Sequence, residues 1–173
     1  VFCTVSEITA RECESLLGST VDVVTPNGFE DDFVWNGREF DEKRAEARRA
    51  MIRTAEATLS CKFDGEPLIV GTSGRYEFRN KGIDIFLDAL KQLAETDALD
   101  REVLVYITVP SATTGPRKDL QAHLADENSP IDPKQNRFCT HYLEHPEWDQ
   151  ILNSIAGSVL ANPSSKVKVV FVP

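Results

Sequence analysis

The sequence predicts an α/β protein with a Rossmann-like parallel sheet, enclosed by helices on both faces as a three-layer sandwich. Short apolar runs at Leu68–Val70, Val103–Val109 and Val167–Val172 are typical of buried strands. Segments with helical periodicity lie between these runs, so the two kinds of element alternate along the chain. Such alternation indicates a parallel sheet, because each crossover between parallel strands usually contains a helix.

The first segment is predicted to form a strand, a helix and a second strand. The apolar run Val1–Val5 begins it, and Ser6 is a good N-cap for the helix that follows. Gly18 can end this helix in a left-handed conformation. The second strand is expected at Val21–Thr25, before a sharp turn at Pro26–Gly28.

A strongly charged helix is predicted at Asp41–Leu59, after an irregular acidic and aromatic segment at Phe29–Phe40. Arginines give this helix a basic stripe, at Arg44, Arg48, Arg49 and Arg53. The favoured interpretation is a solvated face on which Glu and Arg side chains pair. A surface that binds the phosphate of an effector is the alternative.

The segment Leu68–Ala94 is the centre of the functional prediction. A buried strand at its start is expected to lead into the loop Gly71–Arg75. From Ile83 the apolar residues recur at helical spacing, which predicts an amphipathic helix. Asn80 can cap this helix, and Asp84 places a negative charge in its first turn, where it suits the helix dipole.

This strand, loop and helix predict a site for a phosphorylated ligand. Ligands of open α/β sheets bind at the carboxyl ends of the strands, next to helix N-termini that attract phosphate. Arg75 and Lys81 bracket the loop with two cations. The plainer alternative is that both are ordinary surface charges. The spacing of Gly71, Gly74 and Gly82 fits neither a P-loop nor the dinucleotide-binding fingerprint.

The second half continues the alternation of strands and helices. Val103–Val109 is expected to be buried on both faces, and the small-residue loop Ser111–Gly115 follows its carboxyl end. The other expected elements are a polar link, a helix, an exposed loop and a second helix, at Thr96–Arg101, Arg117–Ala125, Asp126–Asn136 and Trp148–Leu160.

The composition argues against several partners. The net charge of −9 disfavours nucleic acid and anionic membranes, which need basic surfaces, and the chain has no apolar run long enough to span a bilayer. The four cysteines form no framework, which indicates reduced thiols in the cytoplasm. Cys139, His141 and His145 match no common zinc spacing, so no metal is expected. Apolar runs beside Val1 and Pro173 suggest an excised fragment.

Three segments together resemble the glycogen synthases of the animal and fungal type. Gly74–Leu90, GRYEFRNKGIDIFLDAL, is similar to a segment of that family, and the order of its Arg, Tyr, Glu and Phe is the same. Thr4–Thr9, TVSEIT, and Val24–Gly28, VTPNG, resemble two further family motifs and occur in the family's order.

The resemblance implies a two-domain glycosyltransferase of the GT-B fold. Residues 1–27 would be the tail of the N-terminal, acceptor-side domain, and residues 28–173 the first part of the nucleotide-sugar-binding domain. The implied reaction transfers glucose from UDP-glucose to the non-reducing end of an α-1,4-glucan such as glycogen, with retention and without a metal or other cofactor. The implied enzyme is cytoplasmic, its full-length form is a candidate homo-oligomer, and the fragment alone is expected to be inactive.

The resemblance also implies roles for individual residues. Arg75 and Lys81 match the two residues of the family that contact the donor diphosphate and stabilise it as it leaves, and Gly74 allows close approach of the backbone. Arg44 and Arg48 lie on the helix that, in relatives, faces glucose 6-phosphate.

Two other functions stay open at this point. One is a retaining transferase of the starch or sucrose synthase type, in which the Arg-to-Lys spacing is usually one residue shorter. The other is a nucleotide-sugar-binding module without catalysis. The sequence does not distinguish UDP-glucose from ADP-glucose.

Overall fold

The structure is a computed structural model that describes residues 1–96 and 98–173. The chain folds into two compact units, Val1–Arg44 and Ala45–Pro173. The expected polar link Thr96–Arg101 includes Asp97, which lies outside the described residues. None of the helices in the described part of the chain is long and apolar enough to cross a membrane.

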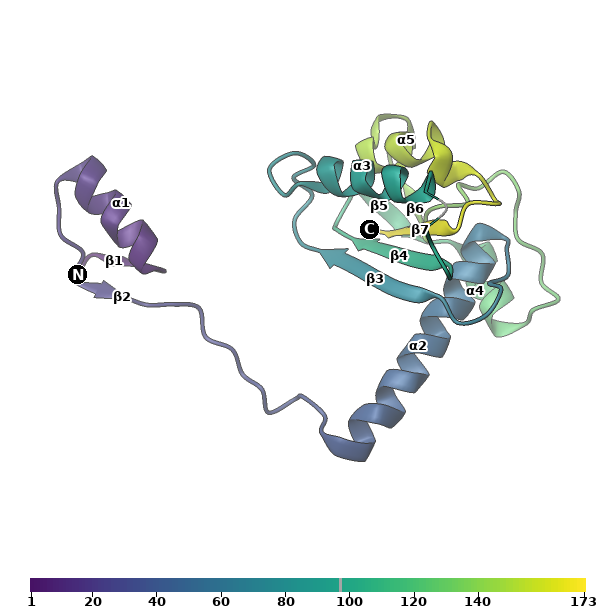
Figure 1. The fold of residues 1–173 in the computed structure, drawn as a ribbon, viewed down its shortest axis with the longest axis horizontal. Helices are drawn as coiled ribbons and strands as arrows, with labels where there is room; N and C mark the ends of the chain where they lie inside the picture. The colour runs from purple at the N-terminus through teal and green to yellow at the C-terminus, as the bar shows by residue number, and fades with distance from the viewer. Residues whose placement is uncertain (97) are drawn as a thin grey trace. The chain divides into compact units, whose positions relative to one another are not determined.

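The first unit contains the predicted strand, helix and strand, with shorter strands than expected (Figure 1). β1 (Cys3–Thr4) pairs in parallel with β2 (Val23–Val24), and α1 (Glu7–Leu17) connects them. The backbone N–H of Thr9 donates a 3.1 Å hydrogen bond to Ser6 Oγ, so Ser6 is the N-cap. Gly18 ends the helix with φ 64°, and both predicted helix limits are confirmed.

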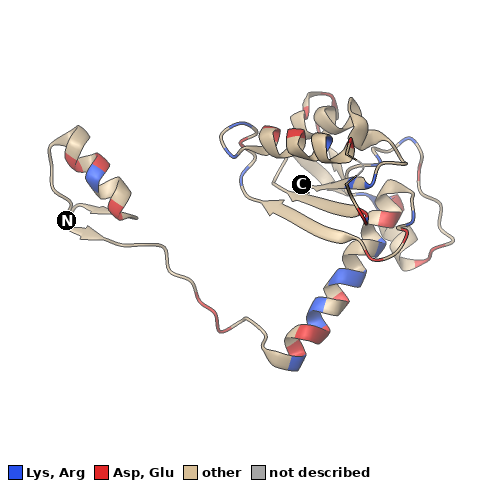
Figure 2. Ribbon diagram, in the orientation of Figure 1, with Lys and Arg blue, Asp and Glu red and all other residues tan. Residues whose placement is uncertain are grey.

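The charged helix α2 (Gly37–Leu59) begins earlier than the predicted Asp41. Cations and carboxylates alternate along it, and Arg38 pairs with Glu42 one turn on at 2.7 Å (Figure 2). This pair agrees with the prediction of a solvated, ion-paired face. Only its C-terminal end is buried, at Ala55, Ala57 and Thr58.

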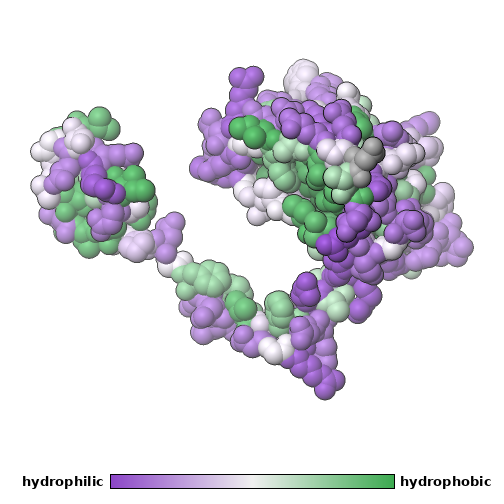
Figure 3. Space-filling model, viewed as in Figure 1, coloured by the Kyte–Doolittle hydropathy of each residue, from purple (hydrophilic) through white to green (hydrophobic). Residues whose placement is uncertain are grey.

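Apolar side chains of the first unit are exposed within that unit, and they appear as green groups around α1 in Figure 3. Ile8, Leu16 and Leu17 of α1 are all exposed, and α1 has no buried residue. The aromatic residues after β2 also stay accessible, and Phe29 and Phe33 make an edge-to-face pair with centroids 5.7 Å apart.

The second unit is built on a parallel three-stranded sheet. Its strands are β3 (Leu68–Ser73), β4 (Val103–Thr108) and β7 (Val167–Val172), in the order β3–β4–β7. β4 pairs in register with both neighbours over its whole length. All of β4 except Thr108 is buried, which confirms the predicted strand that is buried on both faces.

Helices cover both faces of this sheet (Figure 1). On one face, α3 (Ile83–Ala94) and α5 (Gln150–Ala156) pack against the β4 residues Val105 and Ile107. On the other face, Ala55, Met51 and Ile52 of α2 pack against Leu104 and Tyr106. The α/β class and the parallel sheet are therefore confirmed.

Two segments of this unit that were expected to be a single helix and a loop differ in the structure. The helix expected at Trp148–Leu160 is divided into a 3₁₀ turn η1 (Pro146–Trp148), α5, and a second 3₁₀ turn η2 (Val159–Ala161). Asp149 caps α5 at its start and Gly157 ends it. These capping residues limit the helix, although apolar residues continue at helical spacing on either side of it. The expected loop at Ser111–Gly115 contains the start of β5 (Thr113–Pro116).

The partner strand of β5, β6 (His141–Leu143), was not predicted at all. The two pair antiparallel with an irregular register, and α4 (Lys118–Ala125) follows β5 close to the predicted helix position. Just before β6, the N–H of Thr140 donates to Phe171 O, so this segment lies beside β7.

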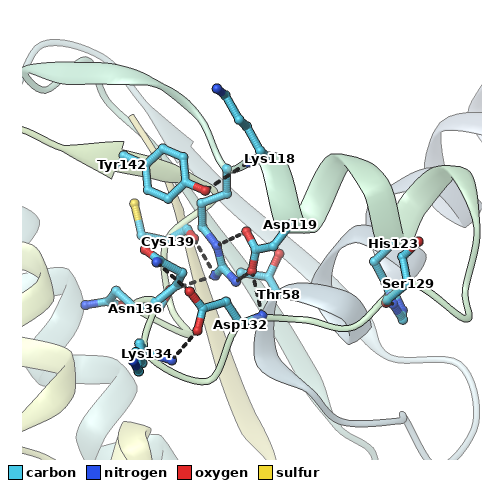
Figure 4. Close-up of polar contacts among 12 residues, drawn as sticks. Thr58, Lys118, Asp119, His123, Ser129, Asp132, Lys134, Asn136, Cys139 and Tyr142 are labelled. Atoms are coloured by element: carbon cyan, nitrogen blue, oxygen red, sulfur yellow. Dashed lines mark hydrogen bonds and ion pairs between the residues drawn. The ribbon is translucent and has the colours of Figure 1, made fainter.

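A buried arginine, Arg117, holds this added segment in place. Figure 4 shows three residues that it contacts, Asp119, Asn136 and Cys139. Arg117 is 1% exposed, and its guanidinium donates to both carboxylate oxygens of Asp119, at 3.1 and 2.6 Å. Its remaining donors reach the carbonyl oxygens of Asn136 and Cys139. The loop between α4 and β6 is thus fixed by one charged group, and the charge is paired as burial requires.

The carboxylate of this pair is held in its ionised form. Burial acts to raise the pKa of Asp119, but hydrogen bonds from Arg117 and from the backbone N–H of Asp132 outweigh it and lower that pKa below its usual value.

Replacing the buried arginine will destabilise the second unit. We expect Arg117→Met to lower the free energy of unfolding by about 3 to 5 kcal/mol, because Asp119 and two carbonyl groups lose the hydrogen bonds that Arg117 donates. Urea unfolding followed by circular dichroism measures this. The matched control is Arg101→Met at an exposed position, which should change the free energy by under about 0.5 kcal/mol. Equal stability of the two variants would contradict the structural role of Arg117.

The pair also predicts a dependence of stability on pH. The pKa of Asp119 is lower in the folded chain than in the unfolded chain, so its contribution is complete at neutral pH and is lost as pH falls through the folded pKa. We therefore expect the stability difference between the wild type and Asp119→Asn to be largest at neutral pH and to shrink below about pH 4. Urea unfolding at several pH values tests this, with Asp100→Asn at an exposed site as control. A difference that does not vary with pH would be inconsistent with it.

Candidate functional site

The predicted phosphate loop lies between β3 and α3, and it begins later than expected. β3 runs to Ser73, so Gly71 belongs to the strand and the loop occupies residues 74–82. Gly74 follows directly, with φ 151°, and its N–H donates to Thr108 O at the end of β4. A side chain at Gly74 would be strained in this conformation although no atom lies in its way. The loop therefore starts at the carboxyl edge of the sheet, as predicted.

Backbone hydrogen bonds give the loop a compact internal order. The N–H of Glu77 donates to Arg75 O at 2.8 Å, and the N–H of Lys81 donates to Glu77 O at 2.9 Å. Gly82 closes the last turn through a bond from its N–H to Arg79 O. These turns place both predicted cations, Arg75 and Lys81, on one short ordered segment.

Tyr76 fastens this loop to the core. Its ring lies edge-on to Phe171 of β7, with centroids 6.3 Å apart. Its hydroxyl accepts a 3.2 Å hydrogen bond from the N–H of Ile151 in the first turn of α5. Burial raises the pKa of Tyr76 to about 12, so the hydroxyl stays neutral at physiological pH.

Both predicted cations are accessible to a ligand. The Arg75 side chain is 77% exposed, and its Nε lies 3.1 Å from Glu77 Oε1. Lys81 is also exposed. An exposed pair such as Arg75 and Glu77 is weak, so the guanidinium can exchange its carboxylate partner for a phosphate.

The start of α3 differs from the sequence prediction. The N-cap is Gly82, with φ 65° and no side-chain hydrogen bond, so the prediction that Asn80 caps the helix was wrong. A residue in the left-handed region is needed there because the loop turns directly into the helix, and glycine adopts it without strain. Asp84 does lie in the first turn, but its own N–H and that of Ile85 already have acceptors. The side chains of Arg75 and Lys81 are therefore better placed to bind a phosphate than the backbone N–H groups at the start of α3.

A hollow of 340 Å³ lies at the same edge of the sheet, beyond the end of β4. Tyr76 forms one wall, and the predicted loop after β4 contributes Pro110, Ser111 and Ala112. The opposite wall comes from η1 and the start of α5, at His145, Trp148, Asp149 and Gln150. Sequence reasoning missed this second wall. The signal that could have found it is Asp149, a residue type that often caps a helix, directly after Trp148.

A larger hollow, of 530 Å³, lies between the C-terminal end of α2 and α4. Its two side-chain cations already have carboxylate partners, since Arg53 contacts Glu127 and Lys62 contacts Glu56. These lining residues therefore offer no free positive charge to an anionic ligand.

The two arginines predicted to face an effector, Arg44 and Arg48, belong to different units. Arg44 is exposed in the first unit. In the second unit, Arg48 Nε lies 2.9 Å from Glu66 Oε2, and Arg48 also donates to Pro67 O. Arg48 is thus engaged by the protein, and an effector role for Arg44 and Arg48 stays a prediction.

The three residues considered for zinc, Cys139, His141 and His145, have other environments. Cys139 is buried, and burial raises the pKa of its thiol to about 11. His141 Nδ1 lies 2.8 Å from Thr140 Oγ1, and His145 stacks on Trp148. Across residues 1–96 and 98–173, no group of three His, Cys, Asp or Glu residues is placed to hold a metal ion.

Comparison with known proteins identifies the family. The family model of glycogen synthase matches residues 1–123. A glycogen [starch] synthase of Neurospora crassa is 36% identical over 120 residues, which are 66% of this chain and 17% of that protein. The liver glycogen [starch] synthase of Homo sapiens is 40% identical over 119 residues, 65% of this chain and 17% of that protein. The Dictyostelium discoideum glycogen [starch] synthase is 36% identical over 120 residues, 65% of this chain and 14% of that protein.

The aligned region spans less than a fifth of the length of these curated relatives. The family match extends to residue 123, so it includes the strand β3, the loop of residues 74–82 and the helix α3. The motifs of this loop, the parallel sheet below it and the family match agree with one another. The chain belongs to the glycogen synthase family.

Proposed function

We propose that the protein containing this chain transfers glucose from UDP-glucose to the non-reducing end of an α-1,4-glucan, with retention of configuration. The proposal is supported most directly by the loop of residues 74–82, which carries two accessible cations at the carboxyl edge of the sheet. The relatives are named as glycogen [starch] synthases, which agrees with a nucleotide-glucose donor and a glucan acceptor.

In this proposal the loop binds the donor diphosphate. Arg75 exchanges Glu77 for a phosphate oxygen, and its planar guanidinium makes two parallel hydrogen bonds there. Lys81 adds a compact charge, and Gly74 lets the backbone approach. As the bond from glucose to the diphosphate breaks, negative charge grows on the leaving group. The cations stabilise that charge more than they stabilise the intact donor, which lowers the barrier.

The loop is held ready for this role by contacts of Tyr76. Its ring packs on Phe171 and its hydroxyl is bonded to Ile151, so the residue next to Arg75 is fixed by both β7 and α5. A preorganised cation costs less reorganisation when charge develops, because the protein does not have to move it at that moment.

The wider organisation is proposed from the family. Residues 1–27 complete an acceptor-side domain and residues 28–173 begin the nucleotide-sugar domain of a GT-B enzyme. The complete enzyme acts in the cytoplasm on glycogen, without a cofactor, and is a candidate homo-oligomer. Arg44 and Arg48 remain the candidates for contact with glucose 6-phosphate.

Removing either loop cation will slow catalysis. In the complete synthase polypeptide we expect Arg75→Ala and Lys81→Ala each to lower kcat by about 100-fold or more, because leaving-group stabilisation is lost. Incorporation of labelled glucose from UDP-glucose and from ADP-glucose into glycogen measures this and identifies the preferred donor.

Arg79→Ala is the matched control, since Arg79 is an exposed cation of the same loop. It should reduce kcat less than about tenfold, because it removes only a general positive charge. If Arg75→Ala and Lys81→Ala keep rates close to that of Arg79→Ala while folded, the loop is not the diphosphate site. If the unaltered polypeptide binds UDP-glucose but transfers nothing, a binding module without catalysis is the better function.

The 173-residue chain by itself is expected to bind UDP weakly and to transfer no glucose. It spans less than a fifth of its curated relatives, and the proposed reaction needs an acceptor domain as well as a donor loop. An incorporation assay with the purified chain checks this. Glucose transfer above the level of the Arg75→Ala chain would contradict it.

A further inference from the structure

Asp149 is a buried carboxylate that connects segments from different parts of the chain. The residue is only 7% exposed. One oxygen, Oδ1, accepts a 2.9 Å hydrogen bond from the N–H of Leu152 and so caps α5. The other, Oδ2, lies 3.4 Å from Ser111 Oγ in the loop after β4 and accepts from it. A buried charge needs such partners, and here they join α5 to the loop after β4.

The third segment is the loop of residues 74–82, which Asp149 reaches through Tyr76. The Tyr76 hydroxyl accepts from the N–H of Ile151, two residues after Asp149. Burial is the main cause of the raised pKa of Tyr76, and the charge of Asp149 and a side-chain hydrogen bond between the two residues raise that pKa further. A hydrogen bond that raises this pKa stabilises the protonated hydroxyl, so Tyr76 donates and Asp149 accepts.

Tyr76 is therefore anchored on several sides. Its hydroxyl both donates and accepts, and its ring packs edge-on against Phe171 of β7. Arg75 precedes it directly in the chain, and the Arg75 side chain is 77% exposed. The backbone position of Arg75 thus depends more on the anchored Tyr76 than on the packing of its own side chain.

We propose that Asp149 is a positioning residue for the transfer reaction, and that it fixes Arg75 through Tyr76. The inference rests on the function proposed for the loop of residues 74–82, and it adds to that loop a residue from the distant segment before α5. The Asp149 carboxylate is buried, so it acts on the donor through Tyr76 and Arg75 and not by direct contact.

A misplaced Arg75 should affect the transition state more than the bound donor. Negative charge on the diphosphate grows as its bond to glucose breaks, and a cation stabilises that charge fully only from the correct position. Asp149→Asn tests this, because asparagine is also a good N-cap and keeps an acceptor for Leu152, while Tyr76 loses the carboxylate. In the complete synthase polypeptide we expect kcat to fall about tenfold and the KM for UDP-glucose to change less than about twofold.

A double-mutant cycle shows whether Asp149 acts through Tyr76. Tyr76→Phe removes the hydroxyl and should lower kcat by a similar factor of about ten. If the two residues act as one unit, the double variant is about as slow as either single variant, whereas independent effects multiply to about 100-fold. Multiplied effects would overturn the proposal.

Asp119→Asn is the matched control, because it removes another carboxylate that the fold largely buries, in the pair with Arg117. It should lower the free energy of unfolding but keep kcat within about twofold of the wild-type value, since Asp119 belongs to the segment held by Arg117. If the folded Asp119→Asn variant transfers glucose as slowly as Asp149→Asn, a general loss of stability explains both results and the positioning role is refuted.

Hydrogen exchange in the 173-residue chain measures the order of the loop without catalysis. The N–H groups of Glu77 and Lys81 are bonded within the loop. In Asp149→Asn they should exchange about tenfold faster, because a loop with a weakened anchor opens more often, while the Leu152 N–H changes less than about twofold. Equal acceleration at Leu152 would mean that α5 itself is loosened, which contradicts a role through Tyr76.

The experiments separate this inference from the function on which it rests. If Arg75→Ala slows transfer about 100-fold while Asp149→Asn and Tyr76→Phe keep the wild-type kcat, the positioning role is refuted and the diphosphate loop stands. If Arg75→Ala leaves kcat unchanged, the proposed function and the positioning role fail together.

Discussion

The structure of the site depends on the burial of β4 on both faces and its in-register pairing with β3 and β7. Because the register is continuous, Ser73, Thr108 and Val172 end at one edge. The loop of residues 74–82 leaves from this edge, and its first N–H is bonded to Thr108. A slip of one residue in β4 would turn its apolar side chains to the wrong layers and displace the loop. The register that packs the core therefore also sets the position of Arg75 and Lys81.

Much of this could be predicted because the signals are local. Ser6 and Gly18 limit α1 through short-range capping, and the three central strands appear in the sequence as apolar runs between turn residues. The position of Arg75 and Lys81 in a loop after a strand follows from the same kind of signal. Their proposed role came from the family motif, since a basic loop alone is weak evidence for a phosphate site.

The missed features depend on partners that are distant in the sequence. β6 has three residues and exists because β5 pairs with it, and Tyr76 meets Ile151 only after α5 docks on the sheet. The second wall of the hollow was missed because helical periodicity continues through Trp148, while the Asp149 cap starts a new helix. Arg117 reads as a surface residue at the start of a helix, and nothing beside it in sequence predicts that it is 1% exposed. Tertiary contacts override local preference at each of these places.

The ion pair between Arg75 and Glu77 has a consequence for which anions the proposed site retains. A ligand with one phosphate that reaches only Arg75 exchanges one negative partner for another, so the number of ionic contacts does not change. A diphosphate that also reaches Lys81 adds a contact that the empty loop lacks. In the proposed site the resident carboxylate would therefore compete with the ligand, and it would favour nucleoside diphosphates over monophosphates and free inorganic phosphate without any steric barrier.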